Sequence, residues 1–329
     1  ITVGAVAGYV VFTVRRDKTF HLKEFVKTDV GIALVIGILT LGLTVNVTDA
    51  LNYALDTSPQ TDIQLTILDK EVYKRARRAD TYYFIVTVNG KKKALKWYKK
   101  HPGAAFKKNL ADNIHRSAPA DNFIWPEALT EERFGSFGYV MPLRPKGYMD
   151  MSEFILLRAK FKDVHAQMNA CLQICEAFQN LHIRGLSYQD MNDGNFFINP
   201  DTGDVLICDN DNVAPDKTSM GILGKAGYMA PEVVEGTTMP NRYTDYYSLA
   251  VCLFILIYMN RPFEGAWYAS CPCDNTAEMA KKLFGFDSVF IMDPSNAKNR
   301  PVPGAHNNVI RRWGVYPNLL ARAFCKTFS

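Results

Sequence analysis

The chain has 329 residues, of which 48% are hydrophobic and 22% are charged, and its formal net charge is +5. This length exceeds one typical domain, and the hydrophobic content is that of a globular protein. The basic residues are scattered or lie in short runs, so the charge gives no argument for nucleic-acid binding. The seven cysteines are irregularly spaced, which argues against a disulfide framework or a zinc site and favours reduced thiols.

The first 48 residues are strongly apolar. Residues 30–48 form nineteen consecutive uncharged positions, close to the about 20 residues with which a helix crosses a bilayer. Residues 1–14 are also uncharged and apolar, and they suggest the end of a preceding span. The alternatives are a signal sequence or a buried hairpin. The pattern therefore predicts one or two transmembrane helices, with the membrane as a partner through residues 30–48.

Residues 82–98 have the pattern of a β-hairpin. Two strand-like runs flank Asn89-Gly90, a dipeptide that favours the tight turn between antiparallel strands. Lys96 then projects from a strand among apolar neighbours. A lysine on an interior face needs an anionic partner such as a phosphate, and the alternative is a surface lysine within a basic run.

Four further segments have recognisable periodicity. Residues 139–143 read as a strand. Residues 164–182 carry apolar side chains at four- and three-residue steps, which predicts a helix that ends at Gly185. A turn at 199–203 joins two short apolar runs and predicts another hairpin. Residues 248–259 are apolar for only twelve positions, a length that predicts a buried core helix and not a span.

The stretch from Tyr188 to Asp211 carries the clearest chemistry. Asp190 is followed five residues later by Asn195, and Asp209 comes after the apolar run 205–207. A carboxylate that accepts a hydroxyl proton, together with amide and carboxylate oxygens that hold Mg²⁺, suits phosphoryl transfer at this spacing. Aspartate is common in turns, so composition alone accounts for some of the acids here.

Five motifs in this order resemble those of the protein kinase superfamily, over about residues 93–329, and most closely a divergent bacterial serine/threonine-kinase-like group. They are Ala94-Leu95-Lys96, Tyr188-Gln189-Asp190, Asp209-Asn210-Asp211, Ala230-Pro231-Glu232 and Asp245-Tyr246-Tyr247-Ser248-Leu249. The resemblance implies an α+β, two-lobed fold with an incomplete small β lobe and a mostly helical large lobe, preceded by the candidate transmembrane helices. The expected domains are a membrane-associated segment (1–48), a connection (49–80), a β-rich part (81–143) and a helical part that is truncated at its end (144–329).

The same resemblance implies ATP and Mg²⁺ as cofactors and assigns roles to five residues. Asp190 would be the base or hydroxyl-orienting carboxylate, and Asn195 and Asp209 would be the Mg²⁺ ligands. Lys96 would clamp the α- and β-phosphates, and Met141 would lie in the linker whose backbone binds adenine. The expected reaction is phosphoryl transfer to Ser or Thr hydroxyls of a protein substrate, without nucleic acid as a partner and with no expectation for the oligomeric state.

Two departures from the family concern the catalytic loop. Tyr188 and Gln189 replace the usual histidine and arginine, so no arginine is expected to pair with a phosphorylated activation loop. Asn192 replaces the usual lysine, while Lys225 stands where a threonine is expected. We hypothesise a swap, in which Lys225 supplies the cation that position 192 lacks.

Other family elements are missing. No glycine-rich loop precedes Lys96, and no glutamate lies between Lys99 and Pro126 to pair with it, Asp112 being the acid at a plausible distance. A late arginine to pair with Glu232 is also missing. A pseudokinase or nucleotide-binding scaffold without turnover is therefore the alternative function, and a membrane sensor with an incidental catalytic part is a third.

The membrane prediction conflicts with this function. The connection between the two apolar segments carries five basic and three acidic residues, so the positive-inside rule places it in the cytoplasm and everything after about Asp49 outside, where ATP is lacking. The segment 30–48 could be re-entrant or not inserted, the topology could be inverted, or residues 1–90 could belong to another protein. The expected location is the membrane with the kinase part in the cytoplasm, or the cytoplasm if the N-terminal segment is misjoined.

Overall fold

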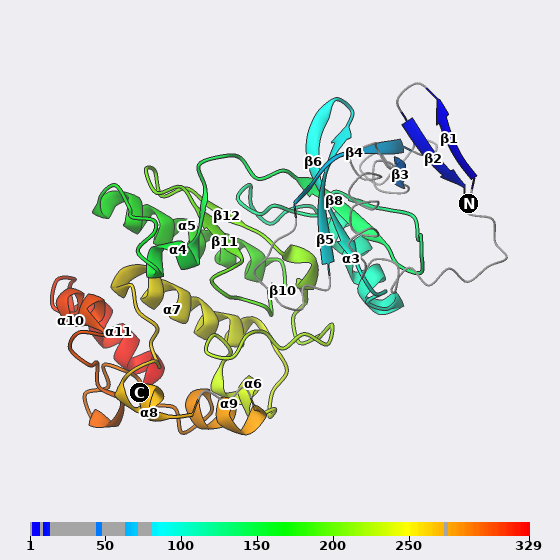
Figure 1. Cartoon of the computed structure of the whole chain (residues 1–329). Coiled ribbons are helices and arrows are strands. Elements are labelled where there is room, and N and C mark those ends of the chain that lie inside the picture. Colours follow the sequence, from blue (N-terminus) through cyan, green and yellow to red (C-terminus); the bar gives the residue numbers. More distant parts are fainter. Residues whose placement is uncertain (1, 7–8, 14–43, 48–62, 72–80, 273–275) are drawn as a thin grey trace. The chain divides into compact units, whose positions relative to one another are not determined.

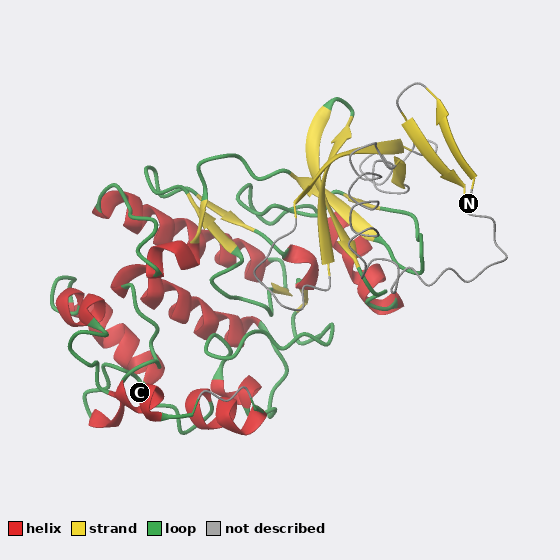
Figure 2. Ribbon diagram, in the orientation of Figure 1, coloured by secondary structure: helices red, strands yellow, loops and turns green. Residues whose placement is uncertain are grey.

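The computed structural model describes residues 2–6, 9–13, 44–47, 63–71, 81–272 and 276–329. The chain forms two compact units, residues 1–117 with 125–144 and residues 118–124 with 145–329. Strands dominate the described part of the first unit and helices that of the second (Figures 1 and 2). The α+β class predicted from the sequence is therefore confirmed.

A six-stranded antiparallel sheet is the centre of the first unit, in the order β3-β4-β5-β6-β8-β7. Its strands are β3 (Thr44–Val47), β4 (Ile63–Glu71), β5 (Thr81–Val88), β6 (Lys91–Tyr98), β7 (Ala128–Leu129) and β8 (Gly138–Pro142). Asn89 and Gly90 join β5 to β6 with positive φ angles of 48° and 74°, as the tight hairpin turn requires. The predicted hairpin is confirmed, and β6 is an interior strand that carries Lys96.

Helix α3 (Ala104–Arg116) belongs to the same unit. Leu110 is fully buried, and the Phe106 ring meets the Tyr98 ring of β6 edge-on with centroids 5.5 Å apart. The buried polar residues of α3 are Asn109 and Asn113, whereas Asp112, the candidate partner of Lys96, is partly exposed. The buried polar positions of this helix therefore carry amides and not a carboxylate.

The described N-terminal residues are strands. β1 (Thr2–Val6) pairs with β2 (Tyr9–Thr13) in an antiparallel hairpin, and residues 44–47 form β3. The prediction of helix at these positions is wrong, because β-branched and aromatic residues such as Val10, Val11 and Phe12 fit a pleated strand as well as an apolar helix. Residues 14–43, with most of the predicted span, lie outside the described residues. Among the helices that are described, none has both the length and the apolarity to cross a bilayer.

Two long helices, α5 and α7, pack against each other in the second unit. The helices of this unit are α4 (Met151–Ile155), α5 (Val164–Ile183), α6 (Pro231–Val234), α7 (Arg242–Tyr258), α8 (Ala266–Ser270), α9 (Ala277–Phe284), α10 (Asn307–Arg312) and α11 (Asn318–Phe328). A capping box of Asn241 and Thr244 begins α7, which satisfies backbone N–H groups that have no partner within the helix. The side chains of Val251, Phe254 and Leu256 are fully buried, so the predicted core helix is confirmed.

Short strands and two turns of 3₁₀ helix connect these helices. They are β9 (Met149–Asp150), β10 (Leu186–Ser187), β11 (Phe196–Ile198), β12 (Val205–Ile207), β13 (Ala214–Pro215), η1 (Asn210–Asn212) and η2 (Ala297–Asn299). β11 and β12 form the predicted hairpin. At its turn, Gly203 has φ +75°, and a Cβ there would lie 1.9 Å from the carbonyl oxygen of Ala166. Glycine is therefore required where the turn packs on the start of α5.

Candidate functional site

The loop of residues 188–195, called the catalytic loop below, is held at its start by Asp245 in the first turn of α7. The Asp245 carboxylate accepts hydrogen bonds from the backbone N–H groups of Tyr188 and Gln189 at 2.6 and 3.1 Å, and lies 3.0 Å from Nε2 of His182. Asp245 is only 2% exposed, and a buried carboxylate needs such partners. Gln189 has a positive φ of 71°. His182 is thus a buried core histidine.

Within the loop, two asparagines hold Asp190. The Asn195 amide donates to the Asp190 carbonyl oxygen at 2.7 Å, and the Asn192 amide donates to the same carbonyl at 3.1 Å and to Asp190 Oδ1 at 3.3 Å. The Asn192 side-chain oxygen accepts from the backbone N–H of Gly194 at 3.0 Å. Asn192 therefore orients the partly exposed Asp190 carboxylate. The sequence, in which Asn192 stands where a lysine is usual, did not indicate this contact.

The predicted Mg²⁺ ligands Asn195 and Asp209 lie together at the open end of the β11/β12 hairpin. Phe196 pairs with Ile207, and the N–H of Cys208 donates to the Asn195 carbonyl at 2.8 Å. Because the Asn195 NH₂ group is bonded to Asp190, its Oδ1 faces away from that bond. Asp209 is partly exposed and adopts the left-handed conformation at φ 60° and ψ 44°. Amide and carboxylate oxygens are ligands that suit Mg²⁺, so this donor set fits the ion, and the metal role of the two residues stays a prediction.

Tyr188 and Asn210 fix the backbone on either side of Asp209. The Tyr188 hydroxyl donates to the carbonyl of Cys208, and burial raises the pKa of Tyr188 well above its ordinary value, so the hydroxyl keeps its proton. The Asn210 amide donates to the carbonyls of Ile124 at 2.7 Å and Ile207 at 3.0 Å. The sequence gave no sign of this contact between Asn210 and Ile124, which lie 86 residues apart.

Lys225 meets a carboxylate that the sequence analysis did not single out. Its Nζ lies 2.8 Å from Asp193 Oδ1, and Nη2 of Arg261 lies 2.7 Å from Asp193 Oδ2. Burial raises the pKa of Asp193, but hydrogen bonding and charge from Lys225 and Arg261 outweigh it and hold that pKa below its usual value. The described partner of Lys225 is therefore Asp193 and not Asn192. Its role beside a transferring phosphate stays a prediction.

The other two predicted residues, Lys96 and Met141, lie in the first unit. Lys96 is 5% exposed, and its Nζ lies 5.7 and 5.8 Å from the ring centroids of Tyr98 and Tyr139. These are cation–π distances. Met141 is buried in β8, opposite Ala94 of β6. The strand-borne, interior position predicted for Lys96 is confirmed, and the nucleotide contacts of both residues stay predictions.

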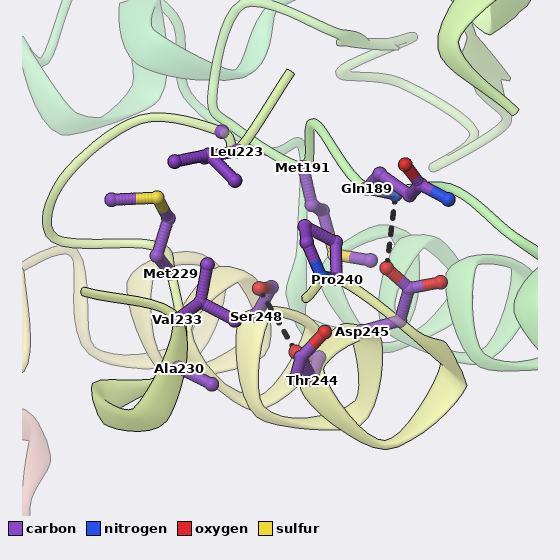
Figure 3. A pocket seen from close by; sticks show the side chains of 11 residues that line it. Gln189, Met191, Leu223, Met229, Ala230, Val233, Pro240, Thr244, Asp245 and Ser248 are labelled. Atoms are coloured by element: carbon purple, nitrogen blue, oxygen red, sulfur yellow. Dashed lines mark hydrogen bonds between the residues drawn. The ribbon is translucent and has the colours of Figure 1, made fainter. Parts of the chain in front are cut away.

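A pocket in the second unit adjoins the catalytic loop (Figure 3). Side chains from the loop, from the segment before α6, and from α7 surround it, and most of them are apolar. The lining residues are Gln189, Met191, Leu223, Gly224, Met229, Ala230, Val233, Pro240, Thr244, Asp245 and Ser248. Polar side chains of Gln189, Thr244, Asp245 and Ser248 share the lining with the apolar ones, among them Met191, which directly follows Asp190.

Comparison with known proteins agrees with this arrangement. Residues 140–295 match the family model described as "Protein kinase domain". The chain is 28% identical over 137 residues to "Probable serine/threonine-protein kinase PknB" of Corynebacterium glutamicum, covering 40% of this chain and 21% of that protein. It is 26% identical over 155 residues to "Probable serine/threonine-protein kinase CCRP1" of Zea mays, covering 46% and 24%.

A third relative, a "Probable serine/threonine-protein kinase" of Schizosaccharomyces pombe, is 31% identical over 104 residues, covering 29% of this chain and 13% of that protein. The chain therefore spans less than a quarter of the length of these three relatives. Over residues 140–295 the chain is therefore similar to a protein kinase domain, and in its own α+β fold a β-sheet precedes this mostly helical part.

Proposed function

We propose that this chain catalyses the ATP- and Mg²⁺-dependent transfer of a phosphoryl group to Ser or Thr hydroxyls of a protein, as a two-lobed kinase. One observation carries the proposal: hydrogen bonds within a single loop and hairpin bring together Asp190, Asn195 and Asp209. These are the carboxylate and the two oxygen ligands that phosphoryl transfer requires.

Asp190 acts as the hydroxyl-orienting base in this proposal. Its carboxylate is partly exposed, with Asn192 at 3.3 Å from Oδ1 and Asn212 at 3.5 Å from Oδ2. Phosphoryl transfer depends mainly on positioning and charge neutralisation, and a carboxylate between two amides is well positioned. Mg²⁺ held by Asn195 and Asp209 would supply the charge neutralisation of the phosphates.

In this proposal, residues of the first unit bind the nucleotide. Lys96 is a buried cation on an interior strand, and it would bind the α- and β-phosphates. The backbone near Met141 would bind the adenine. A protein substrate is supported by the similarity to serine/threonine-protein kinases.

Two measurements test the proposal. The first is thermal stabilisation by ATP with and without Mg²⁺, and the second is transfer of the γ-phosphate to the chain itself or to a general protein substrate. We expect Asp209→Asn to lose the Mg²⁺-dependent part of the stabilisation, and Asp190→Asn to keep it while losing transfer by a factor of about 10² to 10⁴, the usual worth of such a base. Asp201→Asn, the same change at an exposed turn position, is the control. Absence of any nucleotide effect would refute both kinase chemistry and nucleotide binding.

A nucleotide-binding pseudokinase is the second candidate. The observation that favours it is the sequence of this region, in which no glutamate lies between Lys99 and Pro126, while the buried polar residues of α3 are Asn109 and Asn113. Stabilisation by ATP without transfer, in the wild type as in Asp190→Asn, would establish this alternative.

Membrane attachment through residues 30–48 and a cytoplasmic location of the kinase part remain proposals that concern segments largely outside the described residues. They are supported by the uncharged run in the sequence. Cell fractionation of the chain with and without residues 1–48 tests the attachment, because a membrane-anchored chain becomes extractable by buffer only when that segment is removed.

A further inference from the structure

Asp193 has an unusual environment for a residue three positions after the proposed base. Its side chain is 7% exposed, and both carboxylate oxygens are paired with cations from distant parts of the chain, Lys225 at 2.8 Å and Arg261 at 2.7 Å. The hydrogen bonds that hold Asp190 within the loop use Asn192 and Asn195. Asp193 therefore binds residues outside the loop, whereas Asn192 and Asn195 bind Asp190 within it.

The contacts of Asp193 join three segments. The carboxylate belongs to the catalytic loop, Lys225 precedes α6, and Arg261 follows the end of α7. Arg261 also donates to the Tyr228 hydroxyl at 3.0 Å, and the charged groups of Lys225 and Arg261 lie 5.3 and 5.4 Å from the Tyr228 ring centroid. The loop, the segment 225–228 and the residues after α7 thus share one network of charges.

We propose that Asp193 is a positioning residue, which uses Arg261 and Lys225 to fix the second half of the catalytic loop so that Asp190 keeps its orientation. The inference rests on the proposed function. Asp245 fixes the backbone of Gln189, directly before Asp190, and Asp193 fixes the chain three residues after it. Asp190 then lies between two fixed points, one near the start of α7 and one beyond its end.

The two cations contribute unequally. The Lys225 side chain is 51% exposed and the Arg261 side chain is 25% exposed. Solvent screens an exposed ion pair strongly, and a guanidinium makes directional hydrogen bonds to a carboxylate better than an ammonium does. Arg261 is therefore the main partner, and its removal has the larger effect.

The kinetic test compares Asp193→Asn, Arg261→Gln, their double variant and Lys225→Gln, with Asp201→Asn as the control that removes an exposed aspartate. We expect Asp193→Asn to lower kcat by about tenfold to a hundredfold, the cost of a misplaced catalytic group, while the KM for ATP stays within about twofold. Arg261→Lys should retain part of the activity that Arg261→Gln loses. The double variant should be no worse than Asp193→Asn, because the two residues act as one unit.

Amide hydrogen exchange separates this inference from the proposed function, because it needs no turnover. We expect faster exchange at residues 192–195 and 225–228 in Asp193→Asn than in the wild type or Asp201→Asn. Unchanged exchange in both segments overturns the inference, as does an increase in KM for ATP that matches the loss in kcat. If the wild type transfers no phosphate, the proposed function fails, and the exchange result still decides whether Asp193 fixes the loop. Should Asp193→Asn not fold, the same exchange measurement on Arg261→Gln, which removes the main partner of Asp193, decides in the same way.

Discussion

Replacing Asp245 by alanine removes the acceptor of three buried contacts at once. The backbone N–H groups of Tyr188 and Gln189 and the ring of His182 all meet this carboxylate. A buried donor left without a partner costs about 1 to 3 kcal/mol, and breaking a buried ion pair or its equivalent costs about 3 to 5 kcal/mol. Since the three donors share one acceptor, we expect the free energy of unfolding to fall by about 3 to 5 kcal/mol.

Denaturant unfolding followed by far-UV circular dichroism measures this change, because most described helices lie in the second unit. Asp245→Asn keeps one acceptor oxygen and should lose less than Asp245→Ala. Asp201→Ala, at an exposed turn position, should stay within about 0.5 kcal/mol of the wild type. If Asp245→Ala lowered the free energy of unfolding no more than Asp201→Ala does, the Asp245 carboxylate would not be what holds the catalytic loop in place.

Three further predictions concern other parts of the second unit. Burial raises the pKa of Cys171 from 9.0 to about 12, so at pH 8 iodoacetamide should modify the less buried Cys271 far faster than Cys171, as mass spectrometry would show. The neutral Cys171 thiol contributes fully to the free energy of unfolding below pH 9, and this contribution is lost as the pH rises towards 12. Asn241→Ala removes the cap of α7 and should lower the free energy of unfolding by about 1 kcal/mol, whereas an unchanged denaturation midpoint would contradict the capping role. Lys225→Ala should reduce phosphoryl transfer, and Asn192→Lys should restore part of it if a cation near Asp190 is what is lost; transfer rates that respond to neither change would rule out the swap.

Local sequence patterns predicted the parts of the fold that depend on neighbouring residues. The Asn89-Gly90 turn, the helix over 164–183 and the β11/β12 hairpin are all set by dihedral preferences or by periodicity within a few residues. The placement of Asn195 and Asp209 at the same end of one hairpin also follows from this local pattern. The error at residues 2–13 has a physical cause, because a short apolar run of β-branched residues is compatible with both helix and strand.

The parts of the site that the sequence did not reveal depend on distant contacts. Arg261 and Asp193 are 68 residues apart, and Asn210 and Ile124 are 86 residues apart. No periodicity connects such positions, since the fold alone brings them together. The sequence could show that a lysine was missing at Asn192, but it could not show which carboxylate receives Lys225.

The charge balance of the catalytic loop explains why these distant contacts matter. Residues 190–195 contain two carboxylates, Asp190 and Asp193, and no basic residue. The cations that pair with Asp193 come from Lys225, in the segment that borders the pocket, and from Arg261 beyond α7. Displacing the segment around Lys225 therefore removes a counter-charge from the loop that carries Asp190. The Lys225–Asp193 ion pair therefore links the segment around Lys225 to the loop of the proposed base, while Arg261 holds the same carboxylate from beyond α7.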